Sequence, residues 1–350
     1  MMRMLNRIVR IVALTVPFML AAGCGTQPAD TAHRAAKKVK IGFLVKMPEE
    51  PWFQNEWKFA RKCADKYGFE VVTIGTPDGG KVLAAIDNMG AQGAQGFVIC
   101  TPDVKLGPAI VQRARRNNLK VLAVDDRFVG SDGTSFMTEV PYMGISARKI
   151  GEMVGKALSD EMRKRGWKTG ETAACGVTFD ELDTARQRTD GAADVLAAAG
   201  FPKDRIYRVH EKTTDVEGGL NAANIVLAQH PDVKRWLVFS MNDEGVMGAV
   251  RALENTGRFN AENVIGVGIG GNSCVVEFRK EKPTGFFATV LISPLRHGFE
   301  TSELMYKWIA DGVEPPKETL TEGILVTRET FEKVMDEQGL TDVAARGKSE

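Results

Sequence analysis

The stretch V-K-I-G-F-L-V-K-M-P-E-E-P-W, residues 39–52, joins a short apolar run to an abrupt polar end. Its first half is β-branched and apolar, which is the pattern of a buried strand in a parallel sheet. Two prolines then stop the strand and fix a rigid loop. This loop carries Lys46, Glu50 and Trp52 at the carboxyl end of the strand, where open α/β sheets bind their ligands.

From residue 39 onward, apolar runs alternate with segments that have one apolar face at helical spacing. Examples of the runs are G-F-V-I-C at 96–100 and R-W-L-V-F-S at 235–240. The alternation predicts an α/β fold with parallel sheets covered by helices on both faces. About a dozen strands exceed what one open sheet usually holds, so we expect two doubly wound lobes.

The late segments indicate how the lobes are connected. A long helix begins at Pro294, and P-P follows at 315–316, which suggests that the chain returns to the first lobe and crosses again. Several crossings make a hinge, and a cleft between lobes is a common place for a small ligand. We expect an N-terminal lobe of residues 39–145 plus 292–322 and a C-terminal lobe of residues 146–291 plus 323–350.

The first residues have the pattern of a processing signal. Arg3, Arg7 and Arg10 precede an apolar run at 11–22 that is too short to span a bilayer, which predicts a secretory leader at 1–23. The end L-A-A-G-C resembles the lipobox of bacterial lipoproteins, in which Cys24 would become the lipidated first residue. The alternative is an ordinary cleaved leader with an incidental cysteine. Residues 24–38 are polar and predict a tether, so we expect an extracytoplasmic protein anchored through Cys24.

Composition argues against several classes of function. The net charge is +1, and without the three arginines of the leader the remainder is slightly acidic, so nucleic acid is not an expected partner. The motifs G-x-S-x-G, H-E-x-x-H and the P-loop do not occur, and we expect no enzyme, no cofactor and no metal. The run G-V-G-I-G-G at 266–271 superficially suggests a dinucleotide loop, but it comes late in the fold and N-S at 272–273 fits a plain helix N-cap.

Four further cysteines have no close pairing in the sequence. A chain of this size does not need a disulfide framework, and none of the four histidines stands at ligand spacing to a cysteine. We therefore expect buried free thiols at Cys63, Cys100, Cys175 and Cys274.

Polar residues at the ends of predicted strands form the candidate site. Thr184 and Arg188 are four apart and share one face of a helix. Together these groups offer donors, acceptors and an indole face, a combination that suits a neutral sugar, whose hydroxyls both donate and accept while its C–H patch packs on an aromatic ring. The candidates are Lys46, Glu50, Trp52, Cys100, Asp125, Asp126, Thr184, Arg188 and Asn242.

Each candidate also has a purely structural interpretation. The pair at 125–126 could cap a helix or form a turn. Trp52 could be a hydrophobic staple, Lys46 and Arg188 could belong to structural ion pairs, and Asn242 could be the N-cap of the helix that follows it.

The strings K-I-G-F-L-V-K-M-P-E-E-P-W-F-Q, G-F-V-I-C-T-P-D, V-D-D-R-F, E-L-D-T-A-R-Q-R-T, M-N-D and V-E-P-P-K resemble the family of L-arabinose-binding proteins of bacterial ABC importers. The resemblance runs from about Val39 to Gly339. It implies the clamshell fold of type I periplasmic binding proteins, with two α/β lobes, three crossings and no catalysis. It also implies a monomer that delivers a monosaccharide to the ABC permease in the membrane.

Carried over by motif position, the resemblance also implies a role for each site residue. Lys46, Asp126, Arg188 and Asn242 would hydrogen-bond the sugar directly, and Trp52 would stack on its ring. Supporting and lining roles would fall to Glu50, Asp125, Cys100, Leu182, Thr184 and Met241.

Three departures from the family pattern concern specificity. Gly270 stands where the family has a second sugar-bonding asparagine, with Asn272 two residues later; Ile145 stands at a pocket methionine; and I-S-P at 292–294 replaces P-S-P. L-arabinose is the best single expectation. Another pentose or hexose such as D-galactose, or a sugar-sensing receptor without transport, is the alternative. A repressor-type regulator would need an N-terminal helix-turn-helix, and the leader occupies that place.

Overall fold

The computed structural model describes residues 38–341. The predicted leader at 1–23, Cys24 and the tether up to residue 37 lie outside the described residues, as do the last nine residues. Within 38–341 no helix is both long and apolar enough to cross a membrane.

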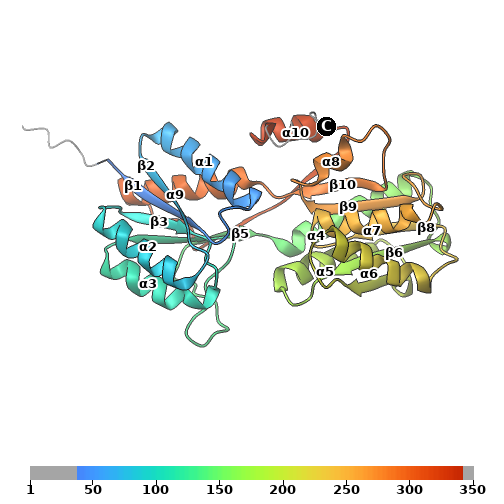
Figure 1. The fold of residues 1–350 in the computed structure, drawn as a ribbon, viewed down its shortest axis with the longest axis horizontal. Coiled ribbons are helices and arrows are strands. Elements are labelled where there is room, and N and C mark those ends of the chain that lie inside the picture. The colour runs from blue at the N-terminus through green and yellow to red at the C-terminus, as the bar shows by residue number, and fades with distance from the viewer. Residues whose placement is uncertain (1–37, 342–350) are drawn as a thin grey trace, which may run out of the picture. The chain divides into compact units, whose positions relative to one another are not determined.

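The first sheet contains six parallel strands in the order β11-β5-β4-β3-β1-β2 (Figure 1). Its central strands β1, β3 and β4 are apolar and buried except for the first residues of β1 and β4, Lys40 and Lys120, as expected for a sheet with helices on both faces. The strands are β1 (Lys40–Val45), β2 (Glu70–Gly75), β3 (Gly96–Ile99), β4 (Lys120–Val124), β5 (Tyr142–Ile145) and β11 (Glu318–Thr321).

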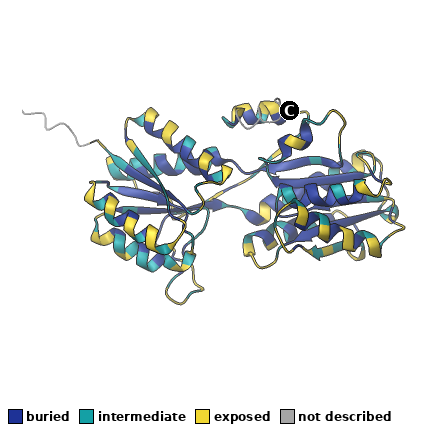
Figure 2. Cartoon of the chain, in the orientation of Figure 1, coloured by how far each residue is buried: buried dark blue, intermediate teal, exposed yellow. Residues whose placement is uncertain are grey.

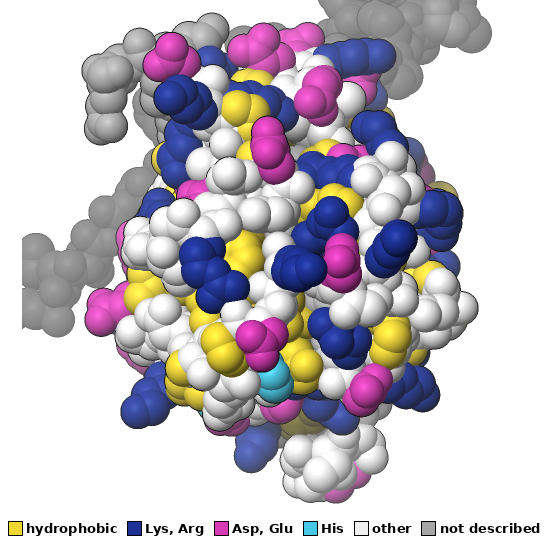
Figure 3. All heavy atoms as spheres, turned by 90° about the vertical axis from the view of Figure 1, so that its right-hand side faces the viewer, with side chains coloured by type: hydrophobic (Ala, Val, Ile, Leu, Met, Phe, Trp, Pro, Cys, Tyr) yellow, Lys and Arg dark blue, Asp and Glu magenta, His cyan; other side chains and the backbone are white. Residues whose placement is uncertain are grey.

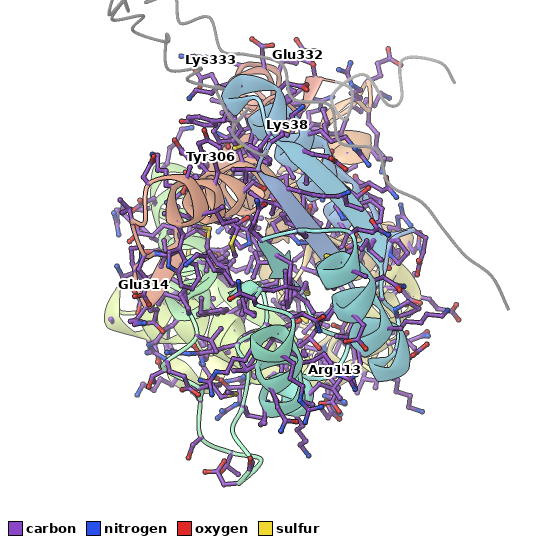
Figure 4. All side chains as sticks on the ribbon, turned by 90° about the vertical axis from the view of Figure 1, so that its left-hand side faces the viewer. Lys38, Arg113, Tyr306, Glu314, Glu332 and Lys333 are labelled. Carbon is purple, nitrogen blue, oxygen red and sulfur yellow. The ribbon has the colours of Figure 1, made fainter. Side chains whose placement is uncertain are left out.

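Four helices cover this sheet. α1 (Pro51–Tyr67) and α9 (Thr301–Ala310) pack on one face, and α2 (Gly79–Ala91) and α3 (Gly107–Arg116) pack on the other. Figure 4 shows Tyr306 on α9 and Arg113 on α3, on opposite sides of the strands. A 3₁₀ turn (Val104–Leu106) precedes α3, and a π-helical turn (Arg296–Glu300) leads into α9.

The second sheet has the order β12-β10-β9-β8-β6-β7. Five of its strands are parallel, and the edge strand β12 runs antiparallel to β10. The strands are β6 (Thr172–Thr178), β7 (Ile206–His210), β8 (Arg235–Phe239), β9 (Val264–Gly270), β10 (Phe286–Leu291) and β12 (Ile324–Thr327).

Helices again cover both faces. The pair α4 (Ala147–Lys164) and α5 (Asp183–Ala198) lies over one core, and the pair α6 (Val216–Gln229) and α7 (Asp243–Asn255) lies over the other. α8 (Cys274–Phe278) and α10 (Phe331–Glu337) add to the second core, and short 3₁₀ turns occupy Thr169–Glu171 and Lys203–Arg205. In Figure 2 the central strands are buried, while the outer faces of the helices are exposed.

The predicted fold class is confirmed, with two additions. β5 and β11 were not expected from the sequence, and β12 breaks the parallel pattern at one edge. The chain passes between the sheets three times, after β5, after β10 and between β11 and β12. The residue boundaries predicted for the two lobes stay a prediction.

Candidate functional site

Lys46, Asp126 and Cys100 meet at the carboxyl edge of the first sheet. The Lys46 Nζ lies 2.5 Å from the Asp126 Oδ2, and the Cys100 Sγ donates to the same oxygen at 3.4 Å. Burial opposes charge on Lys46, but the neighbouring Cys100 and Asp126 raise its pKa, so the ammonium stays charged. Burial also raises the pKa of the Cys100 thiol, which is therefore neutral, and Asp126 is the effective partner. The ion-pair interpretation of Lys46 is thus confirmed, and its contact with a sugar stays a prediction.

The pair Asp125–Asp126 forms a tight turn directly after β4. Asp125 has φ +63°, and the Asp126 N–H donates to the Val124 carbonyl at 2.7 Å. Aspartate is one of the few residues that tolerates the left-handed region, because its side chain can bond locally. The turn interpretation is confirmed, and the helix-cap interpretation is wrong, because no helix begins here.

The side chain of Asp125 is held by two further segments. Trp52 Nε1 donates to its Oδ2 at 3.1 Å, and His297 Nδ1 lies 2.6 Å from its Oδ1. The Tyr142 hydroxyl donates to its backbone carbonyl at 2.9 Å. Burial would raise the pKa of Asp125, but the His297 hydrogen bond and charge, the Trp52 bond and Lys46 together lower it. Asp125 is therefore ionised, and its carboxylate holds the Trp52 and His297 side chains in place.

Glu56 and His297 complete this group and were missed by sequence reasoning. Both side chains are 0% exposed, and His297 Nε2 lies 2.9 Å from the Thr321 hydroxyl at the end of β11. The sequence did contain one indication that Glu56 is unusual. It follows Phe53 by three residues and precedes Ala60 by four, so an acidic residue occupies the buried face of α1. The sequence contains no comparable indication for His297, because none of its neighbours along the chain shows which residues it contacts.

Three other predicted residues of the first group have simpler surroundings. Trp52 is the second residue of α1, half-buried, and its ring meets His297 edge-on with centroids 5.3 Å apart. Glu50 is exposed and precedes α1 without capping it through its side chain. Ile145 ends β5 and packs against the core that includes Ile292. Stacking of a sugar on Trp52 stays a prediction.

Arg188 anchors the second group, at the carboxyl edge of the second sheet. Its Nη1 donates to the Met241 carbonyl at 2.8 Å, and its Nε is buried without a hydrogen-bond partner among residues 38–341. Burial lowers its pKa to about 10, so it remains a cation at neutral pH. Arg188 forms no ion pair with any residue between 38 and 341: it bonds a carbonyl, and its remaining donors can serve a ligand.

A glycine on α4 allows the close helix packing that places Arg188. A Cβ at Gly151 would lie 2.0 Å from the Arg188 carbonyl oxygen, so only glycine lets α4 and α5 approach this closely. The tertiary packing of two helices thus sets the position of the guanidinium.

Asn242 is the N-cap of α7. Its Oδ1 accepts from the Gly245 N–H at 2.8 Å, and its Nδ2 donates to the Thr214 carbonyl at 2.7 Å. The N-cap interpretation is confirmed. An amide oxygen has two lone pairs and an amide nitrogen has two hydrogens, so one acceptor and one donor remain for a ligand.

The remaining predicted residues lie near the carboxyl ends of strands of the same sheet. Met241 is buried, Thr184 is half-buried, and Leu182 precedes α5 with 48% of its surface exposed. Gly270 ends β9 with φ +129°, a conformation that is accessible essentially only to glycine. A Cβ built there would meet only the Asp243 carboxyl, 3.7 Å away.

Metal and redox chemistry have little support among the described residues. Glu56, Asp125 and His297 place ligand-type atoms within 4.8 Å of one another, but the 2.6 Å contact between Asp125 and His297 already joins two of them directly. The prediction of buried free thiols is confirmed for Cys63, Cys100, Cys175 and Cys274. On the face drawn in Figure 3, basic and acidic side chains are interspersed.

Each sheet thus presents one cation with polar neighbours at its carboxyl edge. On the first sheet Lys46 is balanced by Asp126 and flanked by Asp125 and Trp52, and on the second sheet Arg188 and Asn242 keep unused hydrogen-bonding capacity. Such a set favours an uncharged ligand that is rich in hydroxyl groups.

Comparisons with known proteins agree with this description. Residues 38–333 match the family described as periplasmic binding proteins and sugar binding domain of LacI family. The chain is 52% identical over 320 residues to the L-arabinose-binding periplasmic protein of Escherichia coli (strain K12), with 91% of this chain and 97% of that protein covered.

A second relative and a solved structure extend the comparison. The chain is 51% identical over 338 residues to the ABC transporter L-arabinose-binding periplasmic protein of Azospirillum brasilense, covering 96% of this chain and all of that one. A crystal structure described as the periplasmic ribose ABC transporter from Conexibacter woesei has a TM-score of 0.70 at 19% identity, covering 85% of this chain and 95% of the other.

Proposed function

The chain belongs to the family of periplasmic binding proteins and LacI-type sugar-binding domains, and from this premise we propose that it binds a monosaccharide, L-arabinose, between its two lobes. It delivers the sugar to the permease of an ABC importer. It carries out no catalysis and acts in the periplasm as a monomer.

The observation that carries this proposal is that each of the two sheets has a charged group at the carboxyl ends of its strands. The Lys46–Asp126 pair lies at the carboxyl ends of the parallel strands of the first sheet, and Arg188 lies at those of the second sheet. The 52% identical relative is described as an L-arabinose-binding protein. Hydrogen bonds to charged groups contribute about 1.5–3 kcal/mol each, so a handful from both sheets supports micromolar or tighter binding of a small hydrated sugar.

Binding by groups on both lobes also supplies a signal that a permease can recognise. A ligand that contacts both lobes favours the closed arrangement by the difference in its affinity for the two states. Three crossings allow the lobes to move as bodies about a hinge. The proposed cycle is capture, closure, docking and release.

Calorimetry of the mature chain tests the ligand. L-arabinose, D-galactose, D-fucose, D-xylose and D-ribose are titrated in turn, after unfolding and refolding to remove any sugar carried through purification. We expect L-arabinose to bind tightest, in the micromolar range or below. If none of the five binds better than millimolar, the sugar assignment is wrong.

The transport role needs a separate experiment, because a sugar-sensing receptor would bind the same ligand. The expected result is that deletion of this gene abolishes uptake of labelled L-arabinose at micromolar concentration, and that the Asp126→Ala protein fails to restore it. Normal uptake in the deletion strain would favour the sensing role.

A further inference from the structure

Glu56 is a buried acid that nothing in the proposed sugar contacts uses. Its side chain is 0% exposed on the inner face of α1, and neither carboxyl oxygen has a hydrogen-bond donor among the described residues. Its carboxyl lies beside that of Asp125 and 3.9 Å from His297 Nδ1. A buried carboxylate without a partner is very costly, so this group requires a physical account.

The ionisable groups around Glu56 follow three strands of the first sheet or lie on the π-helical turn, and most of them are acids. The nearest, Asp125, already accepts from Trp52 and contacts His297, so it stays ionised. Of the surrounding groups that can carry positive charge, Lys46 is taken up by Asp126 at 2.5 Å, and His297 contacts Asp125 at 2.6 Å. The surrounding titratable groups are Lys46 after β1, Cys100 after β3, Asp125 and Asp126 after β4, and His297 on the π-helical turn.

Two adjacent carboxyl groups in a buried site cannot both be charged at low cost. A proton held on one of them turns mutual repulsion into a hydrogen bond. Burial, and after it the charge of Asp125, raises the pKa of Glu56 well above its ordinary value, so Glu56 is the group that keeps the proton. Asp125 offers the acceptor, because its other bonds hold it in the ionised form.

We propose that Glu56 is protonated and donates a hydrogen bond to the Asp125 carboxylate, and that it thereby acts as a positioning residue for the sugar site. The carboxyl proton stays on Glu56 and no group is oxidised or transferred. For its effect on affinity, the inference rests on the proposed sugar-binding function.

The connections of Asp125 explain why this proton matters at the site. Asp125 orients the Trp52 indole, and its backbone turn places Asp126 against Lys46. Through His297 the same carboxylate reaches Thr321, so it ties β4 to the two segments that return to and leave the first sheet. A second negative charge at Glu56 would repel Asp125 and disturb all of these contacts.

A proton fits the geometry better than a metal ion does. Asp125 Oδ1 and His297 Nδ1 are 2.6 Å apart, a hydrogen-bond distance that leaves no room for an ion between them. The π-helical turn is also pressed onto α1, since a Cβ at Gly298 would lie 2.3 Å from the Glu56 carbonyl oxygen. A bound metal is kept as an outcome of the test.

The first measurement needs no sugar. In infrared spectra of the metal-free protein near pH 7, the stretching band of a protonated carboxyl should be stronger in the wild type than in Glu56→Gln. The band that remains in Glu56→Gln comes from Glu211, whose pKa burial raises to about 7. Glu277→Gln is the matched control, because Glu277 is equally buried but its oxygens accept from Lys280 and Thr284. Loss of the band in the control alone, or an identical band in all three proteins, overturns the proposal.

Thermal unfolding between pH 5 and pH 9 gives an independent readout. A folded-state pKa above the unfolded one means that the folded protein holds a proton that the unfolded chain has released, so stability falls as the pH rises above the ordinary carboxyl range. The amide in Glu56→Gln cannot titrate. The melting temperature of Glu56→Gln relative to the wild type should therefore rise with pH, and a constant difference contradicts the proposal.

Affinity for L-arabinose over the same pH range, with EDTA present, tests the positioning role. We expect wild-type affinity to fall at least tenfold once Glu56 ionises, while Glu56→Gln stays flat and Glu56→Ala is weak throughout. Parallel profiles for the wild type and Glu56→Gln, or binding that zinc restores and EDTA removes, overturn it. If no sugar binds at any pH, the proposed function fails, and the infrared and unfolding results still decide whether Glu56 holds a proton.

Discussion

At the scale of single residues, each lobe places one cation at its candidate site, and the two cations differ in how they are balanced. Asp126 neutralises Lys46 at 2.5 Å, whereas Arg188 donates to a backbone carbonyl and has a buried Nε without a hydrogen-bond partner among residues 38–341. Removing one member of a buried charged set leaves its partner unpaired, which costs more than the bond itself.

Asp126→Ala and Arg188→Ala should each weaken L-arabinose binding at least tenfold, because each removes charged hydrogen-bonding capacity worth about 1.5–3 kcal/mol. Calorimetry gives the dissociation constants, and circular dichroism checks folding. Asp87→Ala is the control: it removes a carboxylate that pairs with Arg113 at 2.7 Å between α2 and α3. Unchanged affinity in both site variants would rule out this pocket.

The departure at Gly270 is a feature of the backbone as well as of the missing side chain. Gly270→Asn should destabilise the protein by about 1–3 kcal/mol, because φ +129° strains any residue with a Cβ. Urea unfolding measures the loss. Gly257→Asn serves as the control, since Gly257 has φ +71° with open space around it, where asparagine is tolerated. Equal stabilities for the two variants would mean that β9 ends differently.

At the scale of elements, helix starts and strand ends supply most of the site. α7 begins at the end of β8, so its N-cap Asn242 stands at the carboxyl edge of the sheet, and the positive end of the helix faces the same direction. One residue therefore contributes to helix stability and, in our proposal, to the ligand.

Two substitutions of Asn242 separate these contributions. Asn242→Ala loses the cap and should lower stability by about 1 kcal/mol, with weaker sugar binding. Asn242→Asp keeps an acceptor for the Gly245 N–H but loses the amide donor, so it should retain stability and still bind sugar less well. Thermal unfolding and calorimetry on both proteins measure the two effects. Full affinity in Asn242→Asp would show that the amide donor does not reach the ligand.

At the scale of the whole molecule, the two lobes repeat one plan. Each has six strands with helix pairs on both faces, and the chain passes between the sheets three times. Each sheet is continuous and its central strands are buried, so we expect movement at the crossings and little within a lobe.

Small-angle X-ray scattering should show a smaller radius of gyration when saturating L-arabinose is added, because contacts from both lobes favour closure. The double variant Asp126→Ala, Arg188→Ala should show no change at the same sugar concentration. A wild-type curve that sugar leaves unaltered, despite binding measured by calorimetry, would contradict closure.

Elements with a strong local pattern could be predicted from the sequence alone. The strand at Lys40–Val45 with its polar loop, the apolar strands at 96–99 and 235–239, and the polar residues at strand ends all follow from apolar runs and breaks in the chain. β5 and β11 escaped prediction because both are four residues long, and E-T-L-T at 318–321 lacks an apolar run; its pairing with β5 makes it a strand.

Which side chains meet could not be predicted, because it depends on the packing of distant segments. Asp125 and His297 are 172 residues apart along the chain, and Glu56 joins them from a third segment. Nothing in local sequence encodes such a contact, because it depends on how α1, β4 and the π-helical turn pack together. Burial then decides the charge of Glu56. In water its side chain would be an ordinary carboxylate, whereas in this packed site burial raises its pKa and, in our proposal, it keeps its proton.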